Sequence, residues 1–434
     1  MSAHEIVTKA GSERAAATEI ARGPLEARQR RETRAQEVLP HAATTARATL
    51  GKTHRLAKRP PFDCVALVLQ GGGALGAYQG GVYQGLAEAG IHPDWVAGIS
   101  IGAINAAIIA GNPAEFRVAR LREFWEFVTA NPARGWLDAF SSTLLRGDLA
   151  RGVFGQIAAA DALVNGAPGF FRLRQLNPWL SSAGSLEATS YYDTTPLRAT
   201  LERLIDFDRI NSGQMQFSVG AVNVQSGNFA YFTDRTHHIG PQHIMASGAL
   251  PPGFAAVEID GEHYWDGGLV SNTPLEWVVE RQERRDMLIF QVDLWNARGA
   301  HPATIANVMS REKEIRFSSR TRAATNAFRR RRRLGSALAS LLERMPADLK
   351  RGPEMALLED AADLSVYNII HLIHRARSFE GASKDYEFSR LAMEEHWKAG
   401  YHDAIRTLRH PEVLQRPKAL DGVFTFDLAV DGRE

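Results

Sequence analysis

The chain has 434 residues, of which 44% are hydrophobic and 23% are charged, and its formal net charge is +2. These values lie close to the averages for soluble globular proteins and exclude collagen-like, coiled-coil and wholly disordered chains. A single cysteine, Cys64, excludes a disulfide framework and a cysteine-based zinc site. The best apolar run, 103–110, is far shorter than the roughly 18 residues that a membrane-spanning helix needs.

The first 60 residues contain no aromatic side chain and are rich in Ala, Arg, Glu and Thr. Such a segment buries too little apolar surface to offset its ordering entropy, so we expect residues 1–60 to form a mobile basic tail. Residues 1–10 include no apolar stretch of the kind found in secretory signals. We therefore expect a cytoplasmic location, which includes the inner face of a membrane.

Two strand–helix pairs follow the tail. The apolar run 64–69 predicts a buried strand, and the glycine-rich stretch 71–76 leads into a helical pattern that Gly90 ends. A second apolar strand over 95–99 runs directly into the apolar helix 101–110. Strand and helix alternate here with short connections, which predicts a parallel α/β sheet.

The remaining elements are less regular. The stretch 115–210 is expected to be mostly helix and loop, anchored in the core by Trp125, Phe127, Trp136 and Phe140. Alternating patterns around a Gln-Ser-Gly turn predict a hairpin over 217–232. Further strands are expected at 288–292 and 366–373, and a last long helix at 388–408.

Ser100 stands at the junction of the second strand and its helix, in the sequence Gly98-Ile-Ser-Ile-Gly102. This is the G-x-S-x-G pattern, in which a sharp turn exposes the serine hydroxyl and the glycines let strand and helix approach closely. The helix N-terminus also brings backbone N–H groups near the serine oxygen. The pattern and its context predict a nucleophilic serine rather than a simple helix cap.

The earlier glycines, Gly71, Gly73 and Gly76, match the dinucleotide fingerprint G-x-G-x-x-G. That fingerprint also requires an acidic residue at the end of the second strand, whereas Asp94 precedes that strand. The nucleotide interpretation therefore fails. The remaining interpretation is an oxyanion hole, in which consecutive glycine N–H groups approach a developing negative charge.

A third element is Asp266, followed by Gly267 and Gly268. An aspartate before two glycines is expected on a tight turn, and Asp-Gly is a common turn dipeptide. Together with the serine turn and the glycine-rich stretch, it suggests the base that activates Ser100.

These three elements, in this order, resemble the patatin-like phospholipase family over roughly residues 62–292. The stretches 192–197 and 246–251 add to the resemblance. The stretch 384–389 and the basic helix expected after Val308 are similar to the bacterial branch that has an added C-terminal region.

The resemblance implies a three-layer α/β/α sandwich with a mainly parallel sheet, plus a largely helical C-terminal extension. We expect an acyl hydrolase domain over 61–300 and the extension over 301–434. The implied catalytic residues are Ser100 as nucleophile and Asp266 as general base, without a catalytic histidine. The implied oxyanion hole is Gly71, Gly72 and Gly73, with Gly76, Gly98, Gly102, Gly267 and Gly268 as supporting glycines.

The sequence departs from the family at Leu75, where Lys or Arg is often found, which puts recognition of a phospholipid headgroup in doubt. A Ser–Asp–His triad would need a histidine after Asp266, and His301, His371 and His374 are available. His263 could also lie near the site. The dyad is the preferred interpretation, and neither a metal nor a nucleotide cofactor is expected.

The cations between Arg311 and Arg333 have three interpretations: attraction to an anionic membrane, a solvated helix face paired with Glu312 and Glu314, or binding of nucleic acid. The last is disfavoured because no sequence pattern of a nucleic-acid-binding fold accompanies the cations. The function expected is hydrolysis of lipid-type esters. Alternatives are hydrolysis of storage-polyester oligomers or acyl thioesters, and a lipid-binding scaffold without turnover. The sequence does not indicate an oligomeric state.

Overall fold

The computed structural model describes residues 54–130, 147–280, 284–318, 321–346, 349–417 and 422–427, with side chains for all of these but 321–324. They belong to one compact unit, which begins at Thr53. Most of the expected mobile tail, residues 1–53, lies outside the described residues. Two of the expected core anchors, Trp136 and Phe140, lie in the segment 131–146, which is also outside them. Residues 54–60 form neither helix nor strand.

A nine-stranded sheet runs through the centre, in the order β11-β10-β9-β1-β2-β5-β8-β7, with β6 paired to β5. Six strands are parallel: β1 (Cys64–Leu69), β2 (Trp95–Gly98), β5 (Gln216–Asn223), β9 (Met287–Asp293), β10 (Tyr367–Ile373) and β11 (Val423–Phe426). The antiparallel strands are β6 (Phe229–Thr233), β7 (Val257–Ile259) and β8 (Glu262–Asp266).

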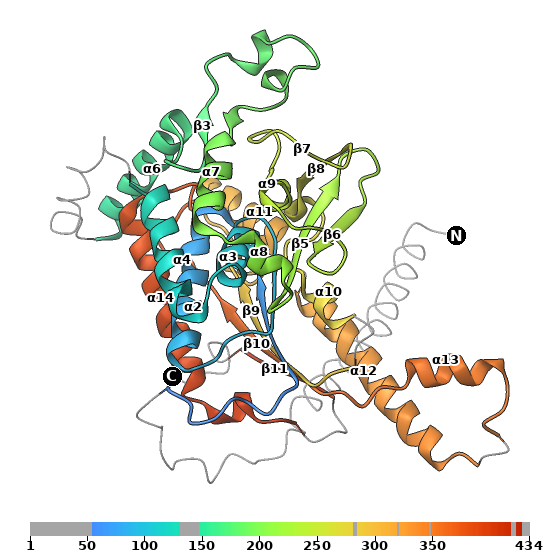
Figure 1. Ribbon diagram of the computed structural model, residues 1–434. Coiled ribbons are helices and arrows are strands. Elements are labelled where there is room, and N and C mark those ends of the chain that lie inside the picture. Colours follow the sequence, from blue (N-terminus) through green and yellow to red (C-terminus); the bar gives the residue numbers. More distant parts are fainter. Residues whose placement is uncertain are drawn as a thin grey trace, which may run out of the picture. The chain divides into compact units, whose positions relative to one another are not determined.

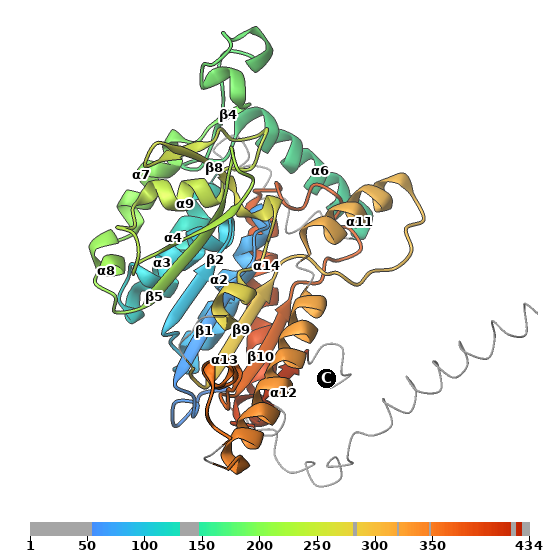
Figure 2. The same ribbon diagram turned by 90° about the vertical axis from the view of Figure 1, so that its right-hand side faces the viewer.

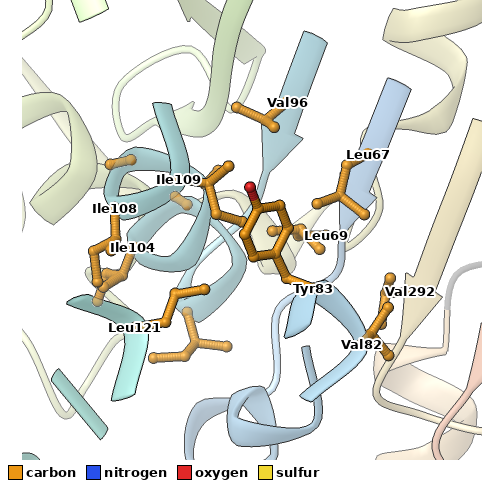
Figure 3. Close-up of a cluster of buried hydrophobic side chains, with 14 of the residues drawn as sticks. Leu67, Leu69, Val82, Tyr83, Val96, Ile104, Ile108, Ile109, Leu121 and Val292 are labelled. Atoms are coloured by element: carbon orange, nitrogen blue, oxygen red, sulfur yellow. The ribbon is translucent and has the colours of Figure 1, made fainter. Parts of the chain in front are cut away.

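Alternate side chains of β1 enter two separate cores because successive residues of a strand face opposite sides of the sheet. Val65, Leu67 and Leu69 pack with α2 (Ala77–Glu88), α3 (Ile101–Ala110), α4 (Ala114–Val128) and α14 (Arg390–Leu408). Figure 3 shows part of this core. Cys64, Ala66 and Val68 pack with α10 (Leu275–Val279) and α12 (Thr321–Arg344) on the other face. Figure 2 shows the resulting three layers, which confirm the predicted fold class.

The remaining elements surround these layers (Figure 1). They are α6 (Asp148–Asn165), α7 (Thr195–Leu204), α8 (Phe207–Asn211), α9 (Pro241–Ser247), α11 (Ile305–Phe317), α13 (Pro353–Ala361), and the short strands β3 (Arg172–Leu173) and β4 (Tyr192–Asp193). In the part of the chain that the structure describes, no helix has the length and apolar character needed to cross a bilayer.

The predicted strands and helices of the first 110 residues and the later strands form as expected, with three differences. Asp266 is the last residue of a strand, β8, where only a tight turn was expected. The basic region forms two helices, α11 and α12, instead of one. Phe127 is 38% exposed, whereas Trp125 is fully buried as predicted.

The region after residue 300 is helical as predicted, and it also extends the sheet through β10 and β11. Its helix α14 packs against α2 with backbone close to backbone. A Cβ on Gly81 would lie 1.9 Å from the Trp397 carbonyl oxygen, and a Cβ on Gly400 would lie 2.0 Å from that of Tyr78. The two helices can approach this closely only because both positions are glycine.

Candidate active site

Ser100 occupies a strained turn between β2 and α3, with φ 56° and ψ −123°. Residues other than glycine rarely adopt a positive φ, and those that do are concentrated at functional sites. A Cβ on Gly98 would lie 2.2 Å from the Gly102 carbonyl oxygen, and one on Gly102 would lie 2.3 Å from the Leu69 carbonyl oxygen. The turn therefore requires glycine at both positions that flank the serine.

A second serine, Ser247 at the end of α9, holds this turn in place. The Ser100 N–H donates to Ser247 Oγ at 3.0 Å, and Ser247 Oγ donates to the Gly220 carbonyl of β5 at 2.7 Å. Sequence reasoning noted the stretch 246–251 only as part of a family resemblance and gave Ser247 no role. Its partners are far away in the chain, so no local pattern could have identified them.

Asp266 reaches the serine from β8 and is only 2% exposed. Its Oδ1 accepts the Gly268 N–H at 2.7 Å, and its carboxyl group shares a hydrogen bond with the Ser100 side chain. Burial raises the pKa of Asp266 to about 7, although these two hydrogen bonds act to lower it. A carboxyl group with this pKa is half-ionised near neutral pH and can accept a proton.

The glycine-rich loop 71–73 lies beside the serine, and the structure separates its three amides. The Gly71 N–H donates to the Asn272 carbonyl at 3.2 Å. The Gly71 carbonyl accepts from Trp295 Nε1 at 3.0 Å and from Asn272 Nδ2 at 3.1 Å. Among the described residues, the amides of Gly72 and Gly73 have no recorded partner, so these two are the better candidates to bind an oxyanion.

Three of the glycines predicted to support the site allow further close contacts around Ser100 and Asp266. A Cβ on Gly76 would lie 2.5 Å from Ile101 Cγ1, and one on Gly267 would lie 2.7 Å from the Gly220 carbonyl oxygen. A Cβ on Gly268 would lie 2.9 Å from Asn272 Oδ1. Asn272 therefore contacts both the glycine-rich loop and the aspartate loop, and sequence reasoning missed it.

The C-terminal region contacts the glycine-rich loop at Gly73 and Ala74. The Ala74 N–H donates to the Asp385 carbonyl at 2.8 Å, and a Cβ on Gly73, whose φ is +55°, would lie 2.1 Å from that carbonyl oxygen. The Asp385 carboxylate in turn accepts from Lys313 Nζ at 2.8 and 2.9 Å. A long-range contact of this kind leaves no local signature in the sequence.

A cavity of about 290 Å³ opens over Ser100, Asp266 and the loop 71–73. Its walls are mainly apolar, and the aromatic ones are Phe170, Phe171, Tyr192, Phe254, Trp295, Phe317, Tyr386 and Phe388. Four of these phenylalanines contact one another with ring centroids 5.4–6.0 Å apart. Leu75 does not line the cavity because its side chain is fully buried in the core.

The four histidines weighed for a catalytic triad, His263, His301, His371 and His374, are all described, and none of them lines the cavity. His374 belongs instead to a buried cluster with Glu380 and His396. Both imidazole Nε2 atoms contact the same Glu380 Oε2, at 3.2 Å and 3.4 Å. Burial alone would raise the Glu380 pKa, but the two histidines hold it well below its usual range.

Within the described residues, this cluster is the group of three side chains that could hold a metal ion, with its ligand atoms within 4.8 Å of one another. Its contacts form a buried network in which two imidazoles share one carboxylate oxygen. The network ties the loop 375–389 to α14. That loop carries Asp385 and Phe388 to the cavity.

Several arginines of the basic segment are held by protein groups. Arg332 pairs with Asp363 and donates to the Ser365 carbonyl, and Arg331 pairs with Glu280 at 2.8 Å. Arg329 donates to Thr425 Oγ1 at 2.6 Å. These contacts favour a structural role for the segment over a free cationic surface.

Comparisons with known proteins match this chain in two places. Residues 67–278 match a family model described as Patatin-like phospholipase, and residues 315–420 match one described as Patatin phospholipase. Lysophospholipase nte1 of Aspergillus terreus is 43% identical over 86 residues, which are 18% of this chain and 6% of that protein. Patatin-like phospholipase domain-containing protein 7 of Mus musculus is 46% identical over 56 residues, 13% of this chain and 4% of that protein.

The chain thus spans only about 6% of the length of the first of these curated relatives. Among solved structures, VipD from Legionella pneumophila has 15% sequence identity and a TM-score of 0.35, over 87% of this chain and 77% of that one.

A pair of glycine variants tests whether Asp385 positions the glycine-rich loop. Gly73→Ala adds a Cβ that meets the Asp385 carbonyl, and we expect kcat for a soluble ester to fall at least tenfold. Gly90→Ala is the matched control, because its φ of +77° carries the same backbone strain but its Cβ meets nothing within 4 Å. It should lose about 1 kcal/mol of stability and keep wild-type kcat. Equal kcat values for the two variants would contradict the contact.

Proposed function

Because the chain belongs to the patatin-like phospholipase family, we propose that it is a serine acyl hydrolase that cleaves lipid-type carboxylic esters. The observation that carries the proposal is the hydrogen-bonded pair of Ser100 and the buried Asp266 beside an apolar cavity. The hydrolase unit is proposed to comprise residues 61–300, with residues 301–434 as an extension that completes the sheet and supports the glycine-rich loop.

In the first step, Ser100 Oγ attacks the ester carbonyl carbon while its proton passes to the Asp266 carboxylate. The carbonyl oxygen becomes an oxyanion, which the Gly72 and Gly73 amides stabilise. Collapse of this intermediate expels the alcohol, which takes the proton from Asp266. A water molecule then gives its proton to Asp266 and attacks the acyl-serine, and the second collapse returns that proton to Ser100 Oγ and releases the carboxylic acid.

The raised pKa explains how an aspartate can act as base without a histidine. An ordinary aspartate, with a pKa near 4, is too weak a base to take a proton from serine efficiently at neutral pH. Burial of Asp266 raises its pKa to about 7, and a general base is most effective when its pKa lies near the pH of the reaction.

The cavity supports an apolar acyl chain as the part of the substrate that binds. Its aromatic walls offer apolar surface next to the reacting serine, as lipid-binding pockets require. Leu75 lies in the core, so the missing cation at this position removes no charge from the cavity wall. Initial rates on a lysophospholipid, a phospholipid, a hydroxyalkanoate oligomer and an acyl-CoA would separate the lipid substrates from the polyester and thioester alternatives.

Two conservative variants test the dyad. We expect Ser100→Ala to abolish hydrolysis of p-nitrophenyl butyrate, because the substitution removes only the nucleophilic hydroxyl. Asp266→Asn should lower kcat at least a thousandfold, because it removes the base and keeps the shape. A fluorophosphonate probe should label the wild type at Ser100 and fail to label the alanine variant. Turnover near the wild-type level in either variant, with unchanged circular dichroism, would falsify the assignment.

The pH dependence of the rate follows from the ionisation of Asp266. Because the base must be unprotonated, kcat/KM for a soluble ester should rise with pH and level off above about 7. Below the plateau it should fall about tenfold for each pH unit. A profile that levels off near pH 4 would mean that the catalytic carboxylate is not buried as described.

Stability should depend on pH in the opposite sense. Between the pKa of an unfolded aspartate, near 4, and about 7, the folded state holds a proton that the unfolded state has lost, so stability decreases as pH rises. This penalty is at most about 4 kcal/mol above pH 7. The Asp266→Asn variant carries no such penalty because asparagine does not ionise. We therefore expect urea unfolding to show that this variant is more stable than the wild type at pH 8. The difference in unfolding free energy between the two proteins should shrink towards pH 4.

A further inference from the structure

Helix α6 is apolar on two opposite faces. Phe154, Ala158 and Ala162 are buried, as expected for the inner face of an amphipathic helix. On the outer face, Leu149, Val153, Ile157 and Val164 are 85%, 52%, 57% and 64% exposed. Their spacing of four, four and seven residues places them in one stripe along the helix. The exposed residues between positions 149 and 165 include no charged side chain.

The excursion between β3 and β4 carries a second exposed apolar group. Figures 1 and 2 show this segment projecting away from the sheet. Trp179 and Leu180 are adjacent, and each is 83% exposed. Residues 175–186 contain no charged side chain. A tryptophan next to a leucine on an uncharged projection is typical of segments that enter the interfacial region of a lipid layer.

Both features connect directly to the catalytic cavity. Leu163, near the end of α6, lines the cavity and is also 44% exposed, so it belongs to both the wall and the outer surface. Tyr192 of β4, at the base of the excursion, lines the cavity and donates from its hydroxyl to the Leu163 carbonyl at 2.8 Å. The stripe and the excursion therefore flank the side of the cavity that Leu163 and Tyr192 form.

We infer that the outer stripe of α6 and the tip of the excursion form a surface that inserts into the apolar layer of a lipid aggregate. We call it the lipid-contact surface and define it by Leu149, Val153, Ile157, Val164, Trp179 and Leu180. The inference rests on the proposed function, because a lipid ester passing from such a layer to Ser100 would enter beside Leu163. Insertion removes these aliphatic and aromatic side chains from water, and the favourable contributions of several such residues add up to stable binding.

This mode of binding differs from electrostatic attraction through the basic segment. Arg329, Arg331 and Arg332 are held by protein groups, whereas the lipid-contact surface is uncharged. Apolar insertion needs no anionic lipid and is not weakened by salt, because screening acts only on charges. Binding to zwitterionic vesicles in high salt therefore separates the two modes.

The test measures binding of the Ser100→Ala protein to phosphatidylcholine vesicles in 0.5 M NaCl by co-sedimentation, so that no lipid is consumed. Two variants remove parts of the surface: Leu149→Gln with Val153→Gln and Ile157→Gln, and Trp179→Ser with Leu180→Ser. The control, Leu334→Gln with Leu357→Gln, changes residues that are 67% and 73% exposed on α12 and α13. Figures 1 and 2 show α13 at the opposite end of the structure from α6.

We expect each surface variant to reduce vesicle binding at least tenfold, and the control variant to bind like the parent protein. In the background with Ser100 intact, all three should keep wild-type kcat/KM for p-nitrophenyl butyrate, because none of the changed residues lines the cavity. Vesicle binding that the surface variants leave unchanged would overturn the inference. So would a shift from dimer to monomer in sedimentation caused by these variants, since a second copy would then cover the surface.

The assays keep the two proposals apart. If the wild type did not hydrolyse p-nitrophenyl butyrate, the proposed function would be contradicted. The vesicle measurement would still show whether the lipid-contact surface binds lipid. Hydrolysis of that ester without any wild-type binding to vesicles would support the proposed function and overturn the lipid-contact surface.

Discussion

The site depends on the close approach of backbone segments at the carboxyl edge of β1 and β2. Ser100 can hold its positive φ only because the chain on either side carries no Cβ. At Gly98 that atom would collide with Gly102, and at Gly102 it would collide with Leu69 of the neighbouring strand. The same principle operates where Gly267 passes Gly220 of β5. A serine, an aspartate and an amide-rich loop from distant positions can meet within hydrogen-bond reach because these crossings hold no side chains.

The close approach has a second consequence, which is the burial of the carboxyl group of Asp266. Packing against β5 and the serine turn removes water from around the group and raises its pKa to about 7. The hydrogen bonds from Gly268 and Ser100 stabilise its ionised form and oppose this shift. The balance leaves a carboxyl group suited to the proposed role of base at neutral pH, and it makes the folded state less stable above that pH. The raised pKa that suits Asp266 to act as a base and the loss of stability above neutral pH both result from burial of the same carboxyl group. A change in that burial would therefore alter both.

Local sequence patterns were sufficient to predict the features that depend on local geometry. Apolar runs beside glycines predicted β1, β2 and their helices, and the spacing around Ser100 predicted its turn. The strand β8 was missed because Glu262 and His263 interrupt its apolar pattern and only pairing with β5 and β7 makes it a strand. Ser247, Asn272 and Asp385 were also missed. Each has at least one partner more than a hundred residues away. The aromatic cavity walls likewise come from separate segments that the fold brings together.

The role of the C-terminal region follows from where its contacts converge. Its strand β10 pairs with β9, its helix α14 packs on α2, and the buried His374, Glu380 and His396 network holds the loop between them. That loop places the Asp385 carbonyl against Ala74, one residue beyond the glycines proposed to bind the oxyanion. The Lys313 ammonium fixes the Asp385 side chain from α11. A displacement of this region would therefore move the amides that we propose stabilise the transition state. An oxyanion hole gains its effect from donors that are already in position, so in the proposed mechanism the region after residue 300 contributes to the chemistry although it supplies none of the proposed reacting groups.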